Sequence, residues 1–133
     1  MAQNTKPIFA LTPETTLGVI TTATTDKSGA TTTNLIEVVE AATNGTKVTQ
    51  VKYKHVGNST AGTFLLFISD TSGSNLRLHS ESPFVAVTSS NTVATAEGTL
   101  FFRDLQLKAG QKIVVGATTA TSDIHVTVSI GNF

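Results

Sequence analysis

The chain contains no cysteine and no tryptophan, only one tyrosine and one methionine, and 14% charged residues. Without cysteine it can form no disulfide framework, thiolate zinc site, iron–sulfur centre or cysteine nucleophile. No apolar run approaches the ~18 residues of a membrane span. The N-terminal MAQNTKP also lacks the basic and then apolar segments of an export signal. We therefore expect no membrane contact and no export by the general route.

Charge is not only sparse but balanced, with nine basic and nine acidic residues. The basic residues are scattered from Lys6 to Lys112 without a cluster, so we expect no nucleic-acid partner. An average globular protein has roughly 25% charged residues. In this chain 25 threonines make up much of the difference. A weakly charged surface tends to associate at neutral pH, which favours a component of an assembly over a free monomer.

The length of 133 residues is that of one ordinary domain. We predict a single β-sandwich domain over residues 1–133 with a short flexible N-terminal arm, residues 1–7. Apolar residues alternate with polar ones from Ile124 to Ile130 and again at Leu76 and Leu78, which is the period of a half-buried strand. Further strands are expected at residues 17–23, 34–42, 84–88, 98–103 and 112–118.

Two segments depart from simple alternation. Residues 47–56 alternate except at Val48, which predicts a bulge near Thr49-Gln50. Residues 64–68, FLLFI, form a continuous apolar run, which is typical of a strand covered on both faces. We expect one of those faces to meet another subunit, and Phe64, Leu66 and Phe67 are the predicted oligomer interface.

Turn residues separate the strands. Asn44-Gly45 predicts a two-residue hairpin, and residues 71–75 and 108–111 predict two further hairpin loops. Residues 24–33 and 89–96 are longer polar stretches that suit loops at the ends of a sandwich. We therefore predict an all-β fold, an antiparallel β-sandwich of about eight strands, with a jelly roll favoured over an immunoglobulin-like topology.

Motifs for catalysis are missing. The sequence has no nucleophile elbow, phosphate loop or dinucleotide fingerprint, so we predict no enzyme activity and no cofactor. The three histidines fall on different predicted strands: His79 and His125 on the polar side, and His55 on the apolar side as a hydrogen-bonded core or interface residue. A metal site built from them is a weak alternative.

The N-terminal segment offers a candidate docking site. Its apolar patch of Ile8, Phe9, Ala10 and Leu11 lies between Pro7 and Pro13. We predict that Lys6, Pro7, Ile8, Phe9 and Leu11 contact a capsid protein or another subunit. The alternative is that the segment covers the edge of its own sheet.

Residues 44–133 resemble a type of small virion protein of tailed bacteriophages. The resemblance lies in the turn Gly57-Asn58-Ser59-Thr60-Ala61-Gly62, the segment Leu105-Gln106-Leu107-Lys108-Ala109-Gly110, and the terminal strand IHVTVSIGNF. It implies a jelly-roll accessory protein that decorates the capsid or belongs to a fibre or tail, often as a trimer. The first forty residues fit this pattern less well.

The leading hypothesis is therefore a non-enzymatic phage structural protein that binds the capsid exterior. As a homo-oligomer, with a trimer favoured, it would bridge and stabilise copies of the major capsid protein. It would be assembled in the bacterial host cytoplasm and located on the virion. The alternative is a receptor- or glycan-binding tail or fibre domain that acts through residues 24–33, 72–75 and 89–96. A third hypothesis is a cupin-type enzyme with a histidine-bound metal.

Overall fold

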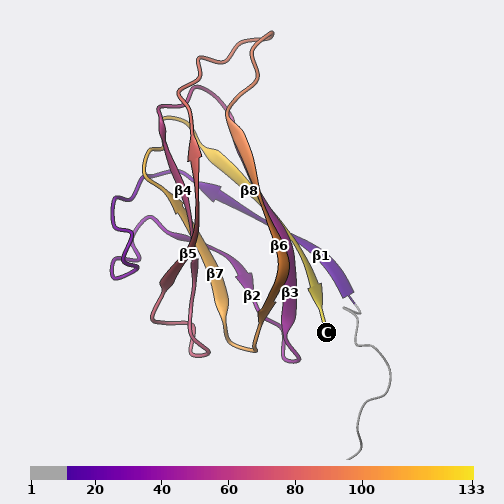
Figure 1. The fold of residues 1–133 in the computed structure, drawn as a ribbon. Coiled ribbons are helices and arrows are strands. Elements are labelled where there is room, and N and C mark those ends of the chain that lie inside the picture. Colours follow the sequence, from indigo (N-terminus) through magenta and orange to yellow (C-terminus); the bar gives the residue numbers. More distant parts are fainter. Residues whose placement is uncertain (1–11) are drawn as a thin grey trace, which may run out of the picture.

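The computed structural model describes residues 12–133, which form eight strands. Figure 1 shows them packed as two layers. The strands are β1 (Thr12–Ile20), β2 (Ile36–Glu40), β3 (Thr46–His55), β4 (Gly62–Ile68), β5 (Arg77–Phe84), β6 (Glu97–Leu107), β7 (Lys112–Ala117) and β8 (Ile124–Asn132). Over this range there is no helix that could cross a membrane.

The strand order is that of a jelly roll. One sheet has the order β1-β8-β3-β6 and the other β2-β7-β4-β5, and all neighbours are antiparallel. The pairs β1–β8, β2–β7, β3–β6 and β4–β5 are nested in the sequence, as in a long hairpin that has been rolled up. The predicted antiparallel β-sandwich is confirmed, and its topology is the jelly roll that the number of strands, the polar end loops and the lack of a cysteine pair favoured.

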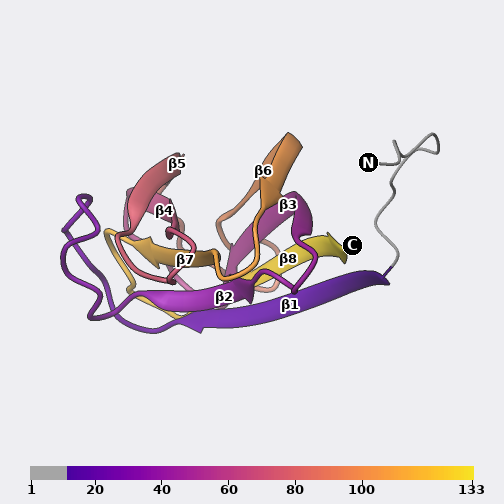
Figure 2. The same ribbon diagram turned by 90° about the horizontal axis from the view of Figure 1, so that it is seen from below.

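The two sheets enclose an apolar core around Tyr53, which is fully buried. Its ring stacks on Phe64 at 4.5 Å between centroids, and its hydroxyl lies 2.7 Å from the hydroxyl of Ser82. Figure 2 shows β1 beside β2 at one edge of the sandwich and β5 apart from β6 at the other. Side chains occupy that wider edge, where the rings of His79 and Phe102 lie 5.7 Å apart.

The predicted bulge in the third strand is confirmed. The register of β3 shifts between Val48 and Gln50 against both of its neighbours. Against β8, Thr49 is the extra residue; against β6, the additional residues belong to β6, between Phe101 and Leu105. The Thr49 hydroxyl donates a hydrogen bond of 3.0 Å to the Ser129 carbonyl. The bulge lets Val48 and Val51 both point into the core, where each is fully buried.

Two predicted hairpins are wrong, although their turns are present. Gly45 adopts a φ of 95° and its N–H donates to the Ala42 carbonyl at 2.9 Å, but β2 and β3 belong to different sheets. Residues 108–111 likewise connect β6 to β7 across the sandwich. By contrast, residues 71–75 join β4 and β5, which do pair, so that hairpin is confirmed.

Some predicted strand limits also need correction. β1 begins at Thr12 instead of residue 17. The separate strand expected at 84–88 does not exist, because β5 ends at Phe84 and Val87 makes only an isolated bridge to Ser59. Residues 24–33 and 89–96 are loops, as predicted.

Candidate interaction surface

The outer face of the β2-β7-β4-β5 sheet is covered by the chain's own β1–β2 loop, residues 21–35. Leu65 and Phe67 point to this outer side, yet both are fully buried, in a small apolar cluster to which Leu35 of the loop contributes. The loop is anchored by a hydrogen bond of 2.9 Å from the Thr24 N–H to the Ala117 carbonyl. The loop therefore shields this face of the sheet from solvent.

This arrangement corrects the expected oligomer interface. Phe64 and Leu66 face the sandwich core, and Phe67 lies under the loop, so none of the three is exposed. The run 64–68 is apolar on both faces because its own chain covers both. A contact with a second subunit has to use other residues.

The outer face of the β1-β8-β3-β6 sheet has no such cover among the described residues, and we call it the open face. The strand register aligns its side chains in rows across the four strands. Four rows cross all four strands: Val19, His125, Lys54 and Glu97; then Leu17, Thr127, Lys52 and Thr99; then Thr15, Ser129, Gln50 and Phe101; and, beyond the bulge, Pro13, Gly131, Lys47 and Gln106.

Large apolar side chains stand out on the two edge strands of the open face. Leu17 on β1 is 74% exposed, and Phe101 on β6 is 77% exposed. Val19, one row from Leu17, is also exposed. Single exposed apolar residues are ordinary, but a phenylalanine and a leucine in neighbouring rows of one uncovered sheet suggest a contact surface.

Charged groups lie between these apolar edges. The ammonium groups of Lys52 and Lys54 lie 3.3 Å and 3.7 Å from one carboxylate oxygen of Glu97. All three side chains are about half exposed, so these pairs add little to stability. Because two lysines face one glutamate, the centre of the face has a slight excess of positive charge.

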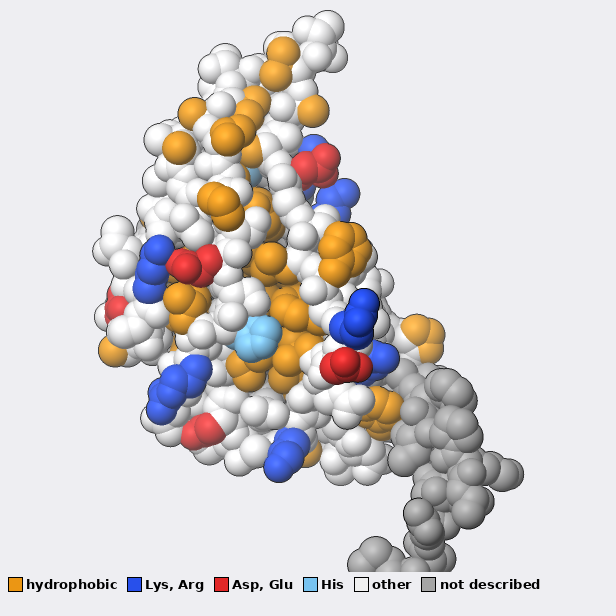
Figure 3. Space-filling model, viewed as in Figure 1, with side chains coloured by type: hydrophobic (Ala, Val, Ile, Leu, Met, Phe, Trp, Pro, Cys, Tyr) orange, Lys and Arg blue, Asp and Glu red, His pale blue; other side chains and the backbone are white. Residues whose placement is uncertain are grey.

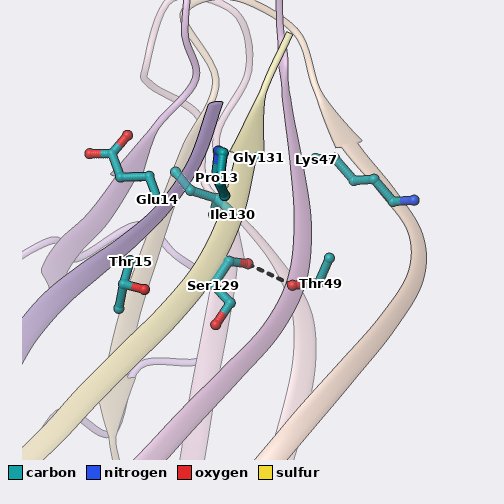
Figure 4. Close-up of a pocket in the computed structure, with 8 residues that line it drawn as sticks. All are labelled: Pro13, Glu14, Thr15, Lys47, Thr49, Ser129, Ile130 and Gly131. Atoms are coloured by element: carbon teal, nitrogen blue, oxygen red, sulfur yellow. Dashed lines mark hydrogen bonds between the residues drawn. The ribbon is translucent and has the colours of Figure 1, made fainter. Parts of the chain in front are cut away.

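A shallow hollow of about 510 Å³ lies at one end of the open face (Figure 4). Pro13 and Gly131 lie side by side there, and Lys47 borders it from β3. The hollow is next to Thr12, where the described chain begins. The candidate docking residues Lys6, Pro7, Ile8, Phe9 and Leu11 lie outside the described residues.

The three loops of the alternative binding hypothesis do not form one surface. Residues 24–33 and 72–75 border a common hollow of about 600 Å³ on the covered sheet. Residues 85–96 follow the end of β5, whereas residues 71–75 precede its start. Because the eight-residue strand spans about 26 Å, the loop 89–96 lies at the opposite end of the sandwich (Figure 1).

The two aspartates of these loops are structural. Asp26 and Asp70 each accept hydrogen bonds from the hydroxyl and the N–H of the serine two residues later. Hydrogen bonds from the serine hydroxyls and other loop donors lower the pKa of both carboxyls to about 2. The carboxylates are thus held in their own turns.

The histidines lie as the strand pattern predicted. His79 and His125 are exposed. His55 is 2% exposed, with its Nδ1 3.2 Å from the Ala96 carbonyl and its ring edge-on to Phe84. Within residues 12–133, no three histidine, aspartate or glutamate side chains come together as metal ligands.

Sequence reasoning missed the open-face residues Leu17, Val19 and Phe101. It placed all three on strands but did not single them out as surface residues. Alternation identifies a buried side by its apolar residues, so apolar residues on the solvent side look like core. The pair Phe101-Phe102 held a signal, since two adjacent phenylalanines on a strand must point to opposite faces.

No protein-family model and no curated protein matches the chain. Among solved structures it is similar to a chain of the capsid asymmetric unit of the cyanophage Pam1, with 20% identity and a TM-score of 0.49. The match covers 99% of this chain and 94% of that one. A likeness of this size does not by itself assign a family or a function.

Proposed function

We propose that this protein is a structural component of a tailed-phage virion that binds the outside of the capsid and stabilises the shell as a homo-oligomer. The observation that carries the proposal is the contrast between the two sheets. One outer face is closed by the protein's own loop, and the other is open and bears Leu17 and Phe101. The sequence resemblance described above supports the phage assignment.

The size of the open face fits a protein contact. Four strands at about 4.8 Å spacing and about eight residues of length give roughly 500 Å². A typical stable interface buries about 800 Å² on each partner. We propose that the segment from Lys6 to Leu11 supplies the rest, because the chain enters the sheet at Thr12 beside this face.

Shell stabilisation would then follow from mass action. A protein that binds only assembled capsid subunits shifts the equilibrium toward the shell by its binding free energy. An oligomer that engages several subunits at once gains further through effective concentration. No chemistry is required of the bound protein.

The test uses shells assembled from the major capsid protein of the same genome. The wild-type protein should co-sediment with these shells and raise their thermal stability. Leu17→Glu and Phe101→Glu should each weaken binding on the order of 10-fold to 100-fold, because each removes an apolar contact and brings a charge to the interface. Thr32→Glu, on the loop that covers the other sheet, is the control and should bind normally.

Two results would contradict the proposal. One is a wild-type protein that neither binds the shells nor stabilises them. The other is a Leu17→Glu, Phe101→Glu double variant that binds as well as Thr32→Glu. Deletion of residues 1–11 tests the docking segment separately, and the proposal expects weaker shell binding with unchanged folding.

A further inference from the structure

The large apolar side chains that are exposed among the described residues fall into two groups. Leu17, Val19 and Phe101 belong to the open face. The others are Val56, Val85 and Val93, with exposed fractions of 52%, 68% and 47%. These three valines lie at one end of the sandwich, on the loops that follow β3 and β5. We call residues 56–61, 85–96 and 118–122 the loop platform.

Hydrogen bonds fasten the three loops of the platform together. Ser59 is the central residue: its backbone pairs with Val87 in both directions, and its hydroxyl donates to the Val85 carbonyl at 2.8 Å. The neighbouring Asn58 accepts from the Ser89 N–H at 3.0 Å and, through its carbonyl, from the Ser122 hydroxyl at 2.8 Å. The exposed valines therefore lie on loops that hydrogen bonds hold to one another.

Residues 56–61 and 85–96, which carry the three valines, contain no charged residue. The β7–β8 loop contains one, Asp123, whose carbonyl accepts a hydrogen bond of 3.0 Å from the Val56 N–H. Several other loops contain charge, for example Asp26 and Lys27 in the β1–β2 loop and Lys108 between β6 and β7, whereas the β2–β3 loop, residues 41–45, does not. In Figure 3 the projecting end of the molecule shows only apolar and uncharged side chains, and the charged ones lie lower down. Depletion of charged residues is characteristic of the centre of a protein interface.

We propose that the loop platform is the contact between copies of this chain, gathered around a rotation axis. This inference rests on the homo-oligomer of the proposed function. A surface that meets a foreign partner can carry charges that the partner complements. Near a rotation axis, however, each residue approaches the same residue of the next copy, so any charge would face its own sign. The uncharged residues 56–61 and 85–96, which are held by hydrogen bonds and carry the three exposed valines, fit this position.

The geometry of the open face agrees with such an axis. The platform lies at the end of the strands, and the open face runs along their side (Figure 1). When platforms meet at the axis, the strands extend outward from it. When the axis is parallel to the normal of the open face, rotation about it keeps every open face pointing in the same direction. All copies could therefore lie on one shell surface at once, which is the arrangement that multivalent binding needs.

The experiment is a measurement of solution mass by light scattering over a wide range of concentrations. The wild-type protein should form a closed oligomer with a whole-number multiple of the 13.9 kDa chain mass. That mass should not change between about 0.1 and 1 M salt, where the Debye length falls from about 10 Å to about 3 Å. Salt-driven dissociation would contradict an uncharged contact.

Val85→Glu should raise the concentration of half-dissociation on the order of 100-fold, since it places like charges around the axis. Val85→Thr keeps the β-branched shape without charge and should remain oligomeric. Val19→Glu, on the open face, is the matched control and should also remain oligomeric. Circular dichroism checks that each variant is folded.

A wild-type protein that is monomeric at every concentration would overturn the proposal, as would an oligomer that persists unchanged in Val85→Glu. These failures are distinguishable from failure of capsid binding. Loss of the oligomer is read from mass alone, whereas capsid binding is read from Leu17→Glu and Phe101→Glu on shells. A monomeric protein that still binds shells would reject the platform contact and the homo-oligomer but not capsid binding, and an oligomer that persists in Val85→Glu would reject the platform contact alone.

Discussion

The covered outer face of the β2-β7-β4-β5 sheet makes a sharp prediction for Phe67. Its side chain is fully buried beneath the protein's own β1–β2 loop. Phe67→Ala should therefore destabilise the folded chain itself. Burial of a phenylalanine side chain contributes about 1.5–3 kcal/mol. A residual cavity of about 80–100 Å³, at about 24 cal/mol per Å³, adds about 2 kcal/mol.

The sum falls in the range of about 3–5 kcal/mol that is typical of buried phenylalanine truncations. For a domain of this length, it corresponds to a Tm lower by about 10–20 °C. The assay is thermal and urea unfolding followed by far-UV circular dichroism. The near-UV signal of Tyr53, the only tyrosine, reports on the core.

Phe101→Ala is the matched control, because the same substitution is made at a side chain that is 77% exposed. It should change the free energy of unfolding by less than about 0.5 kcal/mol. The reasoning is refuted if Phe67→Ala keeps the wild-type Tm but dissociates the oligomer. That result would place Phe67 between subunits, as its sequence suggested, and not beneath the β1–β2 loop.

Two further predictions concern the core and the loops. Gly98→Ala should destabilise the protein by about 1–3 kcal/mol, because its Cβ would clash with the hydroxyl and ring of the buried Tyr53; an unchanged urea midpoint would contradict this packing. Asp26 and Asp70 have pKa values lowered from 3.8 to about 2, so the stability they contribute is complete above about pH 4 and is lost as the pH falls toward 2. Between pH 5 and pH 8 these two groups should leave the Tm unchanged. The Asp26→Asn, Asp70→Asn double variant should lose less stability than wild type between pH 4 and pH 2, and an equal loss would show that the lowered pKa values are wrong.

Strands with a strong local signal could be predicted from sequence. β8 is recognisable because Ile124, Val126, Val128 and Ile130 alternate with polar residues, and the bulge in β3 is visible as the phase change at Val48. Local patterns also gave the turn at Gly45, since a positive φ there suits glycine. β1 was underestimated because its first residues, Thr12 to Thr16, lack alternation and lie on a sheet edge.

Pairing between strands could not be read from the same patterns. The turn at Gly45 joins strands of different sheets, while β1 pairs with β8 from the other end of the chain. A turn sequence specifies the local backbone angles and not the sheet to which the next strand belongs. That choice depends on contacts between residues far apart in the chain, which a local pattern does not contain.

The amino-acid sequence by itself therefore determined the all-β class, most strand positions and the low-charge, threonine-rich surface. Only the tertiary structure decided which apolar residues are core and which are surface. Phe67 is hidden because the β1–β2 loop folds over it, and Phe101 is exposed because nothing in residues 12–133 covers its sheet. Both are phenylalanines on strands, and what separates them is the distant part of the chain that packs, or does not pack, against each one.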